Sequence, residues 1–399
     1  MTKSDWKKCK LGDVAQFKTG KLNSNAAVSN GKYSFFTCAP KPLKIDTYAY
    51  DQSAILLAGN NADGNFAIHY YDGKFNAYQR TYIINTKSQI CNLKYLYYAL
   101  SLCLKDFKLL SQGTSTKFLT AVILNNFEIL LPPLNEQKKI AGILGVLDDK
   151  IELLQKQNKT LEDMAKAIFK SWFVDFDVVH AKQKGLPKAD IMREYHLTDE
   201  LYDLFPSGFE PSALGPIPSG WQVKTLGDIS TCYDSKRIPL SNRERAERQG
   251  NYPYYGATSI MDHVDDFLFD GIYLLLGEDG SVVKPEGTPF LQYVFGKIWV
   301  NNHAHVLQGK APVGTEFLYL FLSDVQIQPY VTGAVQAKLN QKNMNSIPVC
   351  MATEDFVRQF QGIIEIYFVK IRSNLKQIQT LTELRDTLLP RLISGKIRV

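Results

Sequence analysis

The sequence feature that most constrains this fold is a regular apolar repeat between Ile140 and Trp172. Its members follow one another at alternating spacings of four and three residues: Ile140, Leu144, Leu147, Ile151, Leu154, Asn158, Leu161, Ala165, Ile168 and Trp172. This heptad spacing is typical of a helix that buries one seam against a partner helix, and Asn158 is the only amide in the seam. At about 1.5 Å per residue, the predicted helix is roughly 50 Å long.

A second copy of the seam, with the same order of spacings, lies near the end of the chain. It contains Phe360, Ile364, Tyr367, Ile371, Asn374, Ile378, Leu381, Arg385, Leu388 and Leu392. The match extends beyond the helices, because Leu11-Gly12-Asp13 recurs as Leu226-Gly227-Asp228 and the Gly113…Leu119 spacing recurs as Gly333…Leu339. Solenoid repeats have periods of about 20–50 residues, so this longer period predicts a tandem duplication of a globular domain followed by a long helix.

Each predicted helix must bury its seam, and the other copy is the nearest partner. Antiparallel pairing with facing residue numbers that sum to 532 places Asn158 opposite Asn374. Each buried amide then has a hydrogen-bond partner, and a seam asparagine is a known register device. We expect an antiparallel coiled coil with a pseudo-two-fold axis, although the chain connectivity also permits parallel pairing. The predicted seam includes Leu147, Ile151, Leu154, Asn158, Leu161, Ile371, Asn374, Ile378 and Leu381.

The segments before the helices alternate short apolar runs with turn residues. In the first copy these runs include Tyr33–Cys38, Ala54–Ala58 and Thr81–Ile84, and the breaks between them are rich in Asn, Gly and Asp. This pattern indicates β-strands joined by tight turns. We therefore expect an α+β fold with two β-rich domains in tandem. The predicted boundaries are 1–135 and 216–352 for the β-rich domains, 136–175 and 353–399 for the long helices, and 176–215 for a linker with one short helix near 190–205.

Composition limits the classes of protein to which this chain could belong. The net charge of +6, from 46 basic and 40 acidic residues, permits a polyanionic partner but does not require one. Six cysteines are scattered with no C-x-x-C pair, which favours reduced thiols and argues against a zinc site. The chain has no signal-like apolar core and no run of eighteen apolar residues, so we expect a cytoplasmic protein that does not enter a membrane.

Two similar domains at the ends of a rigid helix pair would be suited to binding DNA. Domains held about one duplex turn apart, roughly 34 Å, would contact the same face of the double helix. The best candidate contacts are the repeated loops before each long helix, where Ser, Thr, Gln and Lys can reach phosphates or base edges. These residues are Thr114, Ser115, Thr116 and Lys117 in the first copy, and Gln336 and Lys338 in the second. The alternative is a structural loop that packs on the helix base.

Three further pairs of segments are weaker candidates. In the first copy they contain Lys18 and Lys21, then Asn60, Asn61 and Asn65, then Gln79 and Arg80; in the second copy they contain Lys236 and Arg237, then Asp279 and Ser281, then Asn302 and His303. Amides suit adenine and carboxylates suit cytosine, although the acidic residues could equally cap a turn. We expect no metal at His303 and His305, because no third ligand lies nearby in the sequence.

Four motifs together give the chain a family resemblance: ILLPPLNEQKKI (129–140), FKSWFVDF (169–176), LGPIPSGW (214–221) and LPRLISGKI (389–397). With these motifs the chain resembles the DNA-specificity subunit of type I restriction–modification systems over residues 6–399. The second copy of the PPLNEQ segment is degenerate and reads Met351-Ala352-Thr353-Glu354-Asp355.

The resemblance implies two target-recognition domains, an antiparallel coiled coil and a subunit that is not itself catalytic. It also implies several partners: double-stranded DNA with a bipartite, asymmetric target, two methyltransferase (modification) subunits, and restriction subunits that supply the motor and nuclease. S-adenosylmethionine, ATP and Mg²⁺ would be used by those partner subunits and not be bound by this chain.

Two other functions stay open at this point. The chain has neither a G-x-x-x-x-G-K-[ST] loop nor the polar-Pro-Pro-aromatic motif of an adenine methyltransferase. Asp148-Asp149-Lys150 is interpreted as solvent-facing charge on the helix and not as a nuclease site. The alternatives are a DNA enzyme with an unrecognised site and a coiled-coil scaffold for other proteins.

Overall fold

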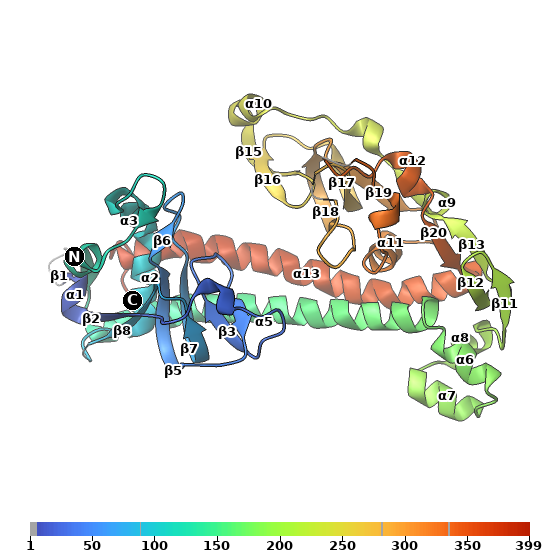
Figure 1. Cartoon of the computed structure of the whole chain (residues 1–399), viewed down its shortest axis with the longest axis horizontal. Helices are drawn as coiled ribbons and strands as arrows, with labels where there is room; N and C mark the ends of the chain where they lie inside the picture. Colours follow the sequence, from blue (N-terminus) through green and yellow to red (C-terminus); the bar gives the residue numbers. More distant parts are fainter. Residues whose placement is uncertain (1–5, 88, 281, 334–335) are drawn as a thin grey trace. The chain divides into compact units, whose positions relative to one another are not determined.

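The computed structural model describes residues 6–87, 89–280, 282–333 and 336–399 (Figure 1). The chain divides into a first unit, Met1–Leu154 with Gln377–Val399, and a second unit, Gln155–Lys376. Two long helices, α5 (Leu134–Phe173) and α13 (Glu354–Ile393), each contribute residues to both units.

The first unit is built on a six-stranded mixed sheet with the order β2-β8-β5-β7-β3-β4. Its central strand is buried on both faces: Ile55 and Leu57 belong to one core cluster, and Ala54 and Leu56 belong to another. This alternation follows from the period of two in a strand. All neighbours in the sheet are antiparallel except β3 and β7. The strands are β2 (Ala15–Thr19), β3 (Tyr33–Phe36), β4 (Leu43–Ile45), β5 (Tyr50–Ala58), β7 (Ile68–Ala77) and β8 (Thr81–Thr86).

The second unit repeats this sheet, with the order β14-β19-β17-β18-β15-β16 and a parallel β15–β18 pair. The predicted tandem duplication is therefore confirmed at the level of strand order. The strands are β14 (Ser230–Cys232), β15 (Gln249–Tyr255), β16 (Ile260–Val264), β17 (Phe269–Gly277), β18 (Leu291–Val300) and β19 (Ala304–Gly309).

Short elements surround each sheet and lead into the long helices. A strand pair precedes each helix: β1 (Lys7–Lys10) with β10 (Glu128–Leu131) in the first unit, and β13 (Gln222–Thr225) with β20 (Pro348–Met351) in the second. The first unit also has α1 (Leu11–Val14), η1 (Ser24–Ala26), β6 (Asn60–Asn61), α2 (Leu93–Leu102), α3 (Leu104–Leu110), β9 (Lys117–Phe118) and α4 (Ala121–Asn126). The second also has α9 (Leu226–Ile229), η2 (Asp234–Lys236), α10 (Asn242–Glu247), α11 (Thr315–Leu322), η3 (Gln328–Tyr330) and α12 (Gln341–Asn345).

The linker contains more structure than the sequence suggested. In place of one short helix it forms three, α6 (Asp177–Gln183), α7 (Lys188–Tyr195) and α8 (Asp199–Leu204), followed by a hairpin of β11 (Phe209–Ser212) and β12 (Gly215–Pro218). Val178, Ile191 and Leu201 of these helices are buried in the main core cluster of the second unit. Apolar side chains therefore order a segment whose Pro and Gly content suggested a loose connection.

In each unit, α5 and α13 pack side by side in opposite directions (Figure 1). In the second unit Asn374 Nδ2 donates to Asn158 Oδ1 at 2.8 Å, and the ring of Phe360 contacts those of Phe169 and Trp172. In the first unit, Leu392 shares a cluster with Ile140 and Leu144. Residue numbers thus fall along α13 as they rise along α5, and the numbers of facing residues sum to 532. The predicted antiparallel pairing and its register are therefore confirmed.

The predicted seam residues are buried or half-buried in this helix pair. Ile151, Leu154, Ile371 and Asn374 are buried, and Leu147, Asn158, Leu161, Ile378 and Leu381 are half-buried. The asparagine layer differs from the expectation in one respect. Asn374 is fully buried, and its Oδ1 has no hydrogen-bond partner among the described residues, so the two amides do not satisfy each other completely.

Charged and phenolic groups attach each β-rich domain to the long helices. Tyr98 of α2 donates to Asp148 Oδ2 at 2.6 Å, and Arg385 of α13 donates to Asp148 Oδ1 at 2.9 Å. Asp148 is therefore not the solvent-facing charge that the sequence suggested, because two donors fix it at the base of the first domain. In the second unit, Tyr319 of α11 donates to Glu162 of α5 at 2.6 Å.

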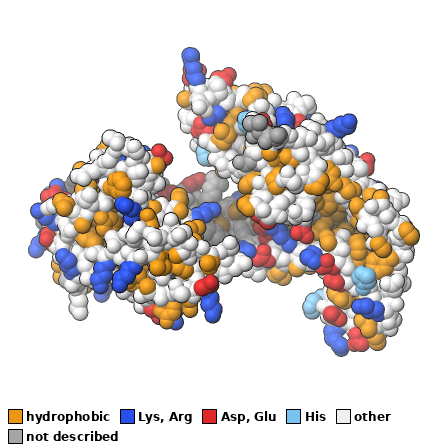
Figure 2. Space-filling view, in the orientation of Figure 1, with side chains coloured by type: hydrophobic (Ala, Val, Ile, Leu, Met, Phe, Trp, Pro, Cys, Tyr) orange, Lys and Arg blue, Asp and Glu red, His pale blue; other side chains and the backbone are white. Residues whose placement is uncertain are grey.

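The described helices include none that combines the length and apolar character needed to cross a bilayer. The view in Figure 2 shows hydrophobic side chains mixed with charged ones over the surface.

Candidate nucleic-acid interface

The structure brings the predicted segments together in the first unit. Strand β6 pairs with β9, so that Asn60 faces Phe118 and Asn61 faces Lys117. The amide of Gly59 also donates to the carbonyl of Arg80 at 2.7 Å. The central loop, the loop before the long helix and the Gln79-Arg80 segment therefore meet at one place, although they are separated in sequence.

The same three segments meet in the second unit. A β-bridge joins Asp279 to Lys338, and the amide of Glu278 donates to the carbonyl of His303 at 2.8 Å. The backbone bond from Leu119 to Gly59 in the first unit has its counterpart from Leu339 to Glu278, both at 2.9 Å. These matching bonds make Asn60 equivalent to Asp279 and Arg80 equivalent to His303.

The two loops before the long helices are equivalent, as predicted, but their lysines are not. Phe118 exchanges both backbone hydrogen bonds with Gln112, and Lys338 does so with Thr332. Lys338 therefore takes the place of Phe118, and Gln336 takes the place of Thr116. A match between Lys117 and Lys338, which the sequence alone allows, is wrong by one residue.

The glycine that begins each loop is required by the loop itself. Gly113 has φ +105° and Gly333 has φ +91°. A Cβ atom would lie 2.0 Å from the carbonyl oxygen of Thr116 in the first case and 2.1 Å from that of Gln336 in the second. Only glycine fits such positions, so the repeated glycine is explained by the turn without any contact to DNA.

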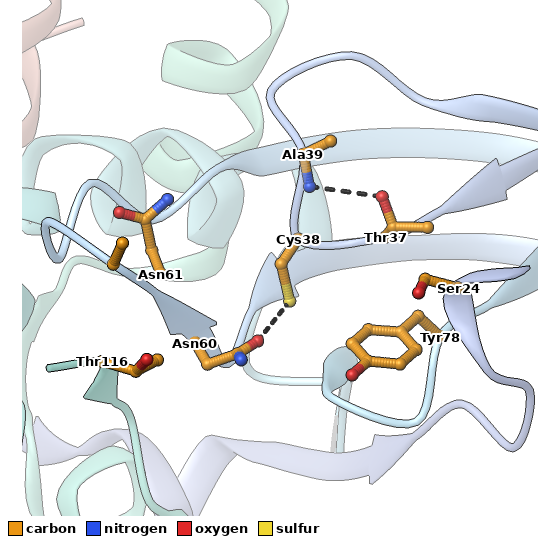
Figure 3. A pocket seen from close by; sticks show the side chains of 9 residues that line it. Ser24, Thr37, Cys38, Ala39, Asn60, Asn61, Tyr78 and Thr116 are labelled. Carbon is orange, nitrogen blue, oxygen red and sulfur yellow. Dashed lines mark hydrogen bonds between the residues drawn. The ribbon is translucent and has the colours of Figure 1, made fainter. Parts of the chain in front are cut away.

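A hollow of about 380 Å³ opens beside these segments in the first unit (Figure 3). The side chain of Asn60 lies in it, and its Oδ1 accepts a hydrogen bond from the thiol of Cys38 at 2.8 Å. Among the lining residues none is basic, so the hollow offers neutral donors and acceptors of the kind that contact base edges. The lining residues are Ser24, Thr37, Cys38, Ala39, Asn60, Asn61, Ala62, Tyr78 and Thr116.

Asn60, Asn61 and Thr116 were predicted from the sequence, whereas Ser24, Thr37 and Cys38 were not. The last two follow β3, and only the parallel pairing of β3 with β7 carries them to the ends of the other strands. The run Tyr33–Cys38 was recognisable as a strand, but its neighbour in the sheet was not.

A buried ion network occupies the corresponding region of the second unit. Arg237, whose side chain is 11% exposed, donates to Glu278 at 2.7 Å and to the carbonyl of Ala304 at 2.7 Å. It also lies 3.3 Å from Asp234. These contacts occupy the guanidinium, so we remove Arg237 from the proposed DNA contacts.

His305 lies at the centre of this network, with an oxygen acceptor at each ring nitrogen. Nδ1 lies 2.5 Å from Asp234 Oδ2, and Nε2 lies 2.7 Å from the carbonyl of Leu339. The carbonyl of Leu339 can only accept, so Nε2 donates to it, and Nδ1 shares a hydrogen bond with the carboxyl group of Asp234. Burial would raise the pKa of Asp234, but the hydrogen bond and charge of His305, with Arg237, hold that pKa below its usual value.

The expectation that His305 has no further potential metal ligands nearby is wrong. Cys232 and Asp234 lie beside His305, with one ligand atom of each residue within 4.8 Å of the others. Such a donor set could hold zinc. However, Arg237 neutralises Asp234, and both ring nitrogens of His305 have protein partners, so we assign the cluster to the ion network.

The other predicted contacts differ in exposure and in their partners. Asn61 Oδ1 accepts from the backbone of Asp63 and Asn65, which makes Asn61 part of a turn. Asn65 Oδ1 accepts from Lys108. Ser281 lies outside the described residues. The exposed members of the set are Lys18, Lys21, Asn65, Gln79, Arg80, Thr114, Ser115, Lys236, Asn302, Gln336 and Lys338, and the half-buried members are Asn60, Asn61, Thr116, Lys117, Arg237, Asp279 and His303.

A duplicated β-rich domain, with variable polar loops meeting at one place in each copy, defines a tandem recognition protein. Comparison with known proteins gives the family. The model of the type I restriction modification DNA specificity domain matches residues 3–163 and 218–351, one match per copy. Since these matches span more than half of the chain, the protein belongs to that family.

Individual relatives agree with this assignment. The chain is 26% identical to the EcoDI specificity subunit of Escherichia coli, over 86% of this chain and 77% of the relative. It is 25% identical to the HindI specificity subunit of Haemophilus influenzae, over 99% and 100%. In fold it resembles the S subunit of a type I system from M. genitalium, with a TM-score of 0.57 at 20% identity, covering 98% and 97% of the two chains.

Proposed function

We propose that this DNA-specificity subunit reads a split target, with one half-site recognised by each unit. The observation that carries the proposal is that the same three loop segments meet in the same register in both units but present different side chains. Equivalent frames with different side chains suit two different half-sites. Side chains at these loops offer the donors and acceptors that read base edges.

Phosphate contacts would come from the exposed lysines. Lys18, Lys21, Lys236 and Lys338 are exposed, and each one that pairs with a phosphate releases counterions. The net charge of +6 suits such a partner. Binding to cognate DNA should therefore weaken steeply as salt rises.

The chemistry of modification and restriction belongs, in this proposal, to partner subunits. They would use S-adenosylmethionine, ATP and Mg²⁺, while this chain selects the sequence and is not itself catalytic. The absence from the sequence of the nucleotide-loop and methyltransferase motifs supports this division of roles.

Two equivalent apolar positions support the docking of two modification subunits, one on each unit. Val146 of α5 is 68% exposed, and Ile366 of α13, which occupies the same position of the repeat, is 71% exposed. Large apolar side chains exposed on a helix mark interaction sites when they form part of a patch. Ile143 adds to the first patch and Val369 to the second.

This docking proposal has its own test. Val146→Asp and Ile366→Asp should each remove one modification subunit from the assembly, and the double variant should remove both, as measured by native mass spectrometry. Full assembly of the double variant would contradict it.

The function itself is tested by mapping methylated adenine in a methylation-free host that expresses this chain with its modification subunit. We expect a split motif with a fixed spacer, and salt-sensitive binding of the complex to DNA that carries it. A stable complex that neither methylates nor binds DNA would favour a scaffold, and methylation or cleavage by the chain alone would favour an enzyme.

A further inference from the structure

We propose that the two units present opposite hydrogen-bond polarity to DNA at one equivalent position, with Asn60 acting as a donor and Asp279 as an acceptor. This inference rests on the proposed function, because it concerns how each half-site is read. It assigns a chemical class of base edge to each unit.

The donor character of Asn60 comes from its neighbour Cys38. The thiol donates to Asn60 Oδ1 at 2.8 Å (Figure 3), and this bond fixes the orientation of the amide. Among the described residues none accepts from Asn60 Nδ2. The amide group therefore turns its oxygen toward Cys38 and offers its NH₂ to the hollow of the first unit.

The acceptor character of Asp279 comes from its chemistry and from Gln336. Gln336 Nε2 donates to Asp279 Oδ1 at 2.8 Å. This bond uses one of the two N–H donors of Gln336 and directs that NH₂ toward Asp279, while Gln336 Oε1 is a second acceptor. The Asp279 side chain is 23% exposed, and its Oδ2 lies 3.7 Å from His303 Nδ1.

The adjacent carboxylate does not share this role. Glu278 is equivalent to Gly59 and is 14% exposed, and its Oε2 lies 2.7 Å from Arg237 while its Oε1 lies 3.8 Å from Lys338. Its charge is therefore balanced within the protein. Asp279 and Gln336 Oε1 form the acceptor surface of the second unit.

The two polarities select different atoms on the base edges. A donor pairs with guanine O6 or N7, adenine N7 or thymine O4, whereas an acceptor pairs with the amino group of cytosine N4 or adenine N6. A carboxylate also repels guanine O6 and thymine O4, because each would place an acceptor against a charged acceptor. The base that Asp279 contacts must then be cytosine or adenine.

The test is an isosteric exchange at each position, measured as the methylation motif of the assembled complex. Asp279→Asn adds a donor and should reduce methylation of the cognate second half-site by roughly tenfold or more while relaxing one base within it. Asn60→Asp should do the same in the first half-site only. Both positions are half-buried and both exchanges preserve shape, and assembly with the modification subunit confirms folding.

Cys38 provides a matched control for the orientation of Asn60. Cys38→Ala removes the donor and should broaden the base preference in the first half-site, and Cys38→Ser restores a donor and should narrow it again. If both alanine and serine variants keep the wild-type motif, the thiol does not orient Asn60.

The outcomes separate this inference from the proposed function. A split motif that stays unchanged in Asp279→Asn and Asn60→Asp would overturn the polarity inference alone. If either variant altered both half-sites together, or if the wild type gave no split motif, the assignment of one half-site to each unit would fail.

Discussion

The two units share a backbone frame but hold it with different chemistry. In the first unit the hydroxyl of Tyr82 donates to the carbonyl of Leu119 at 2.9 Å, and in the second unit Nε2 of His305 donates to the carbonyl of Leu339 at 2.7 Å. A phenol thus does in one copy what an imidazole, hydrogen-bonded to Asp234, does in the other. Both units therefore keep a side-chain hydrogen bond to the equivalent loop carbonyl, which we call the loop anchor. The groups around this anchor are neutral in the first unit and charged in the second.

The starts of the two long helices differ in the same way. Gln137 is fully buried, and its amide donates to the carbonyls of Ile90 and Pro132 and accepts from the backbone of Asn92. The equivalent position of the second copy is Val357, which is 1% exposed and packs in the core. The hydrogen bonds of Gln137, which we call the polar clasp, and the apolar contacts of Val357 are alternative ways to hold the start of a long helix. This difference accounts for the degenerate second copy of the PPLNEQ segment.

The largest effect should come from breaking the charged network of the second unit. Arg237→Ala removes the guanidinium that lies between Glu278 and Asp234, and removing one partner of a buried ion pair costs about 3–5 kcal/mol. Hydrogen exchange measured by mass spectrometry should show faster exchange in β19 and unchanged exchange in β8. The control is Lys236→Ala, at the exposed neighbouring residue, which should lower the free energy of unfolding by less than about 0.5 kcal/mol. An equal loss of stability in both variants would mean that the burial of Arg237 is unimportant.

A smaller effect is expected at the polar clasp of the first unit. Gln137→Val, which introduces the residue type of the second copy, removes the side-chain partner of three backbone groups, of which the bond to Pro132 is fully buried, and should cost about 2–3 kcal/mol. Urea unfolding measures the change in the free energy of unfolding. Gln155→Val, at an exposed position of the same helix, is the control, and a similar cost at both sites would contradict the clasp.

Exchanging the loop anchor should give an effect that depends on pH. A carboxyl whose pKa is lowered in the fold adds stability above its unfolded pKa, about 3.9, and this stability is lost as the pH falls through the folded pKa. His305→Tyr removes the partner that lowers the pKa of Asp234. The variant should therefore be less stable than the wild type near pH 7 by about 1–2 kcal/mol, and the difference should narrow below about pH 4.

The control for this pH effect is the equivalent residue of the first unit. Tyr82→Phe removes a neutral donor, and burial raises the pKa of Tyr82 so that it stays neutral in this range. Its cost should not vary between about pH 3 and pH 7. A His305→Tyr difference that is equally constant with pH would argue against an ion pair at Asp234.

The smallest effect is expected in the asparagine layer of the helix pair. Asn374 Oδ1 is buried without a partner among the described residues, and replacing both members of a polar pair by apolar groups is often neutral. The double variant Asn158→Leu, Asn374→Leu should change the unfolding free energy by less than about 1 kcal/mol, in either direction. A clear loss of stability in urea unfolding, as large as that expected for Gln137→Val, would show that the layer stabilises the fold.

The strength of each sequence signal explains what was predictable. The pairing register was predicted correctly, because the unbroken heptad spacing defines the seam and the single asparagine in each copy favours the register that places Asn158 opposite Asn374. The linker helices were missed because their apolar residues are few and are separated by Pro and Gly. Arg237 was misassigned because a sequence does not reveal burial, and Cys38 was missed because parallel strand pairing leaves no local signal.

The most direct test of the account is to disable one recognition surface at a time and map adenine methylation by the assembled complex. One variant combines Asn60→Ala with Thr116→Ala in the first unit, and the other combines Asp279→Ala with Gln336→Ala in the second. The account predicts that each variant degrades one half of a split motif and leaves the other half and the spacer unchanged. Loss of both halves in either variant, or no change in both, would contradict it.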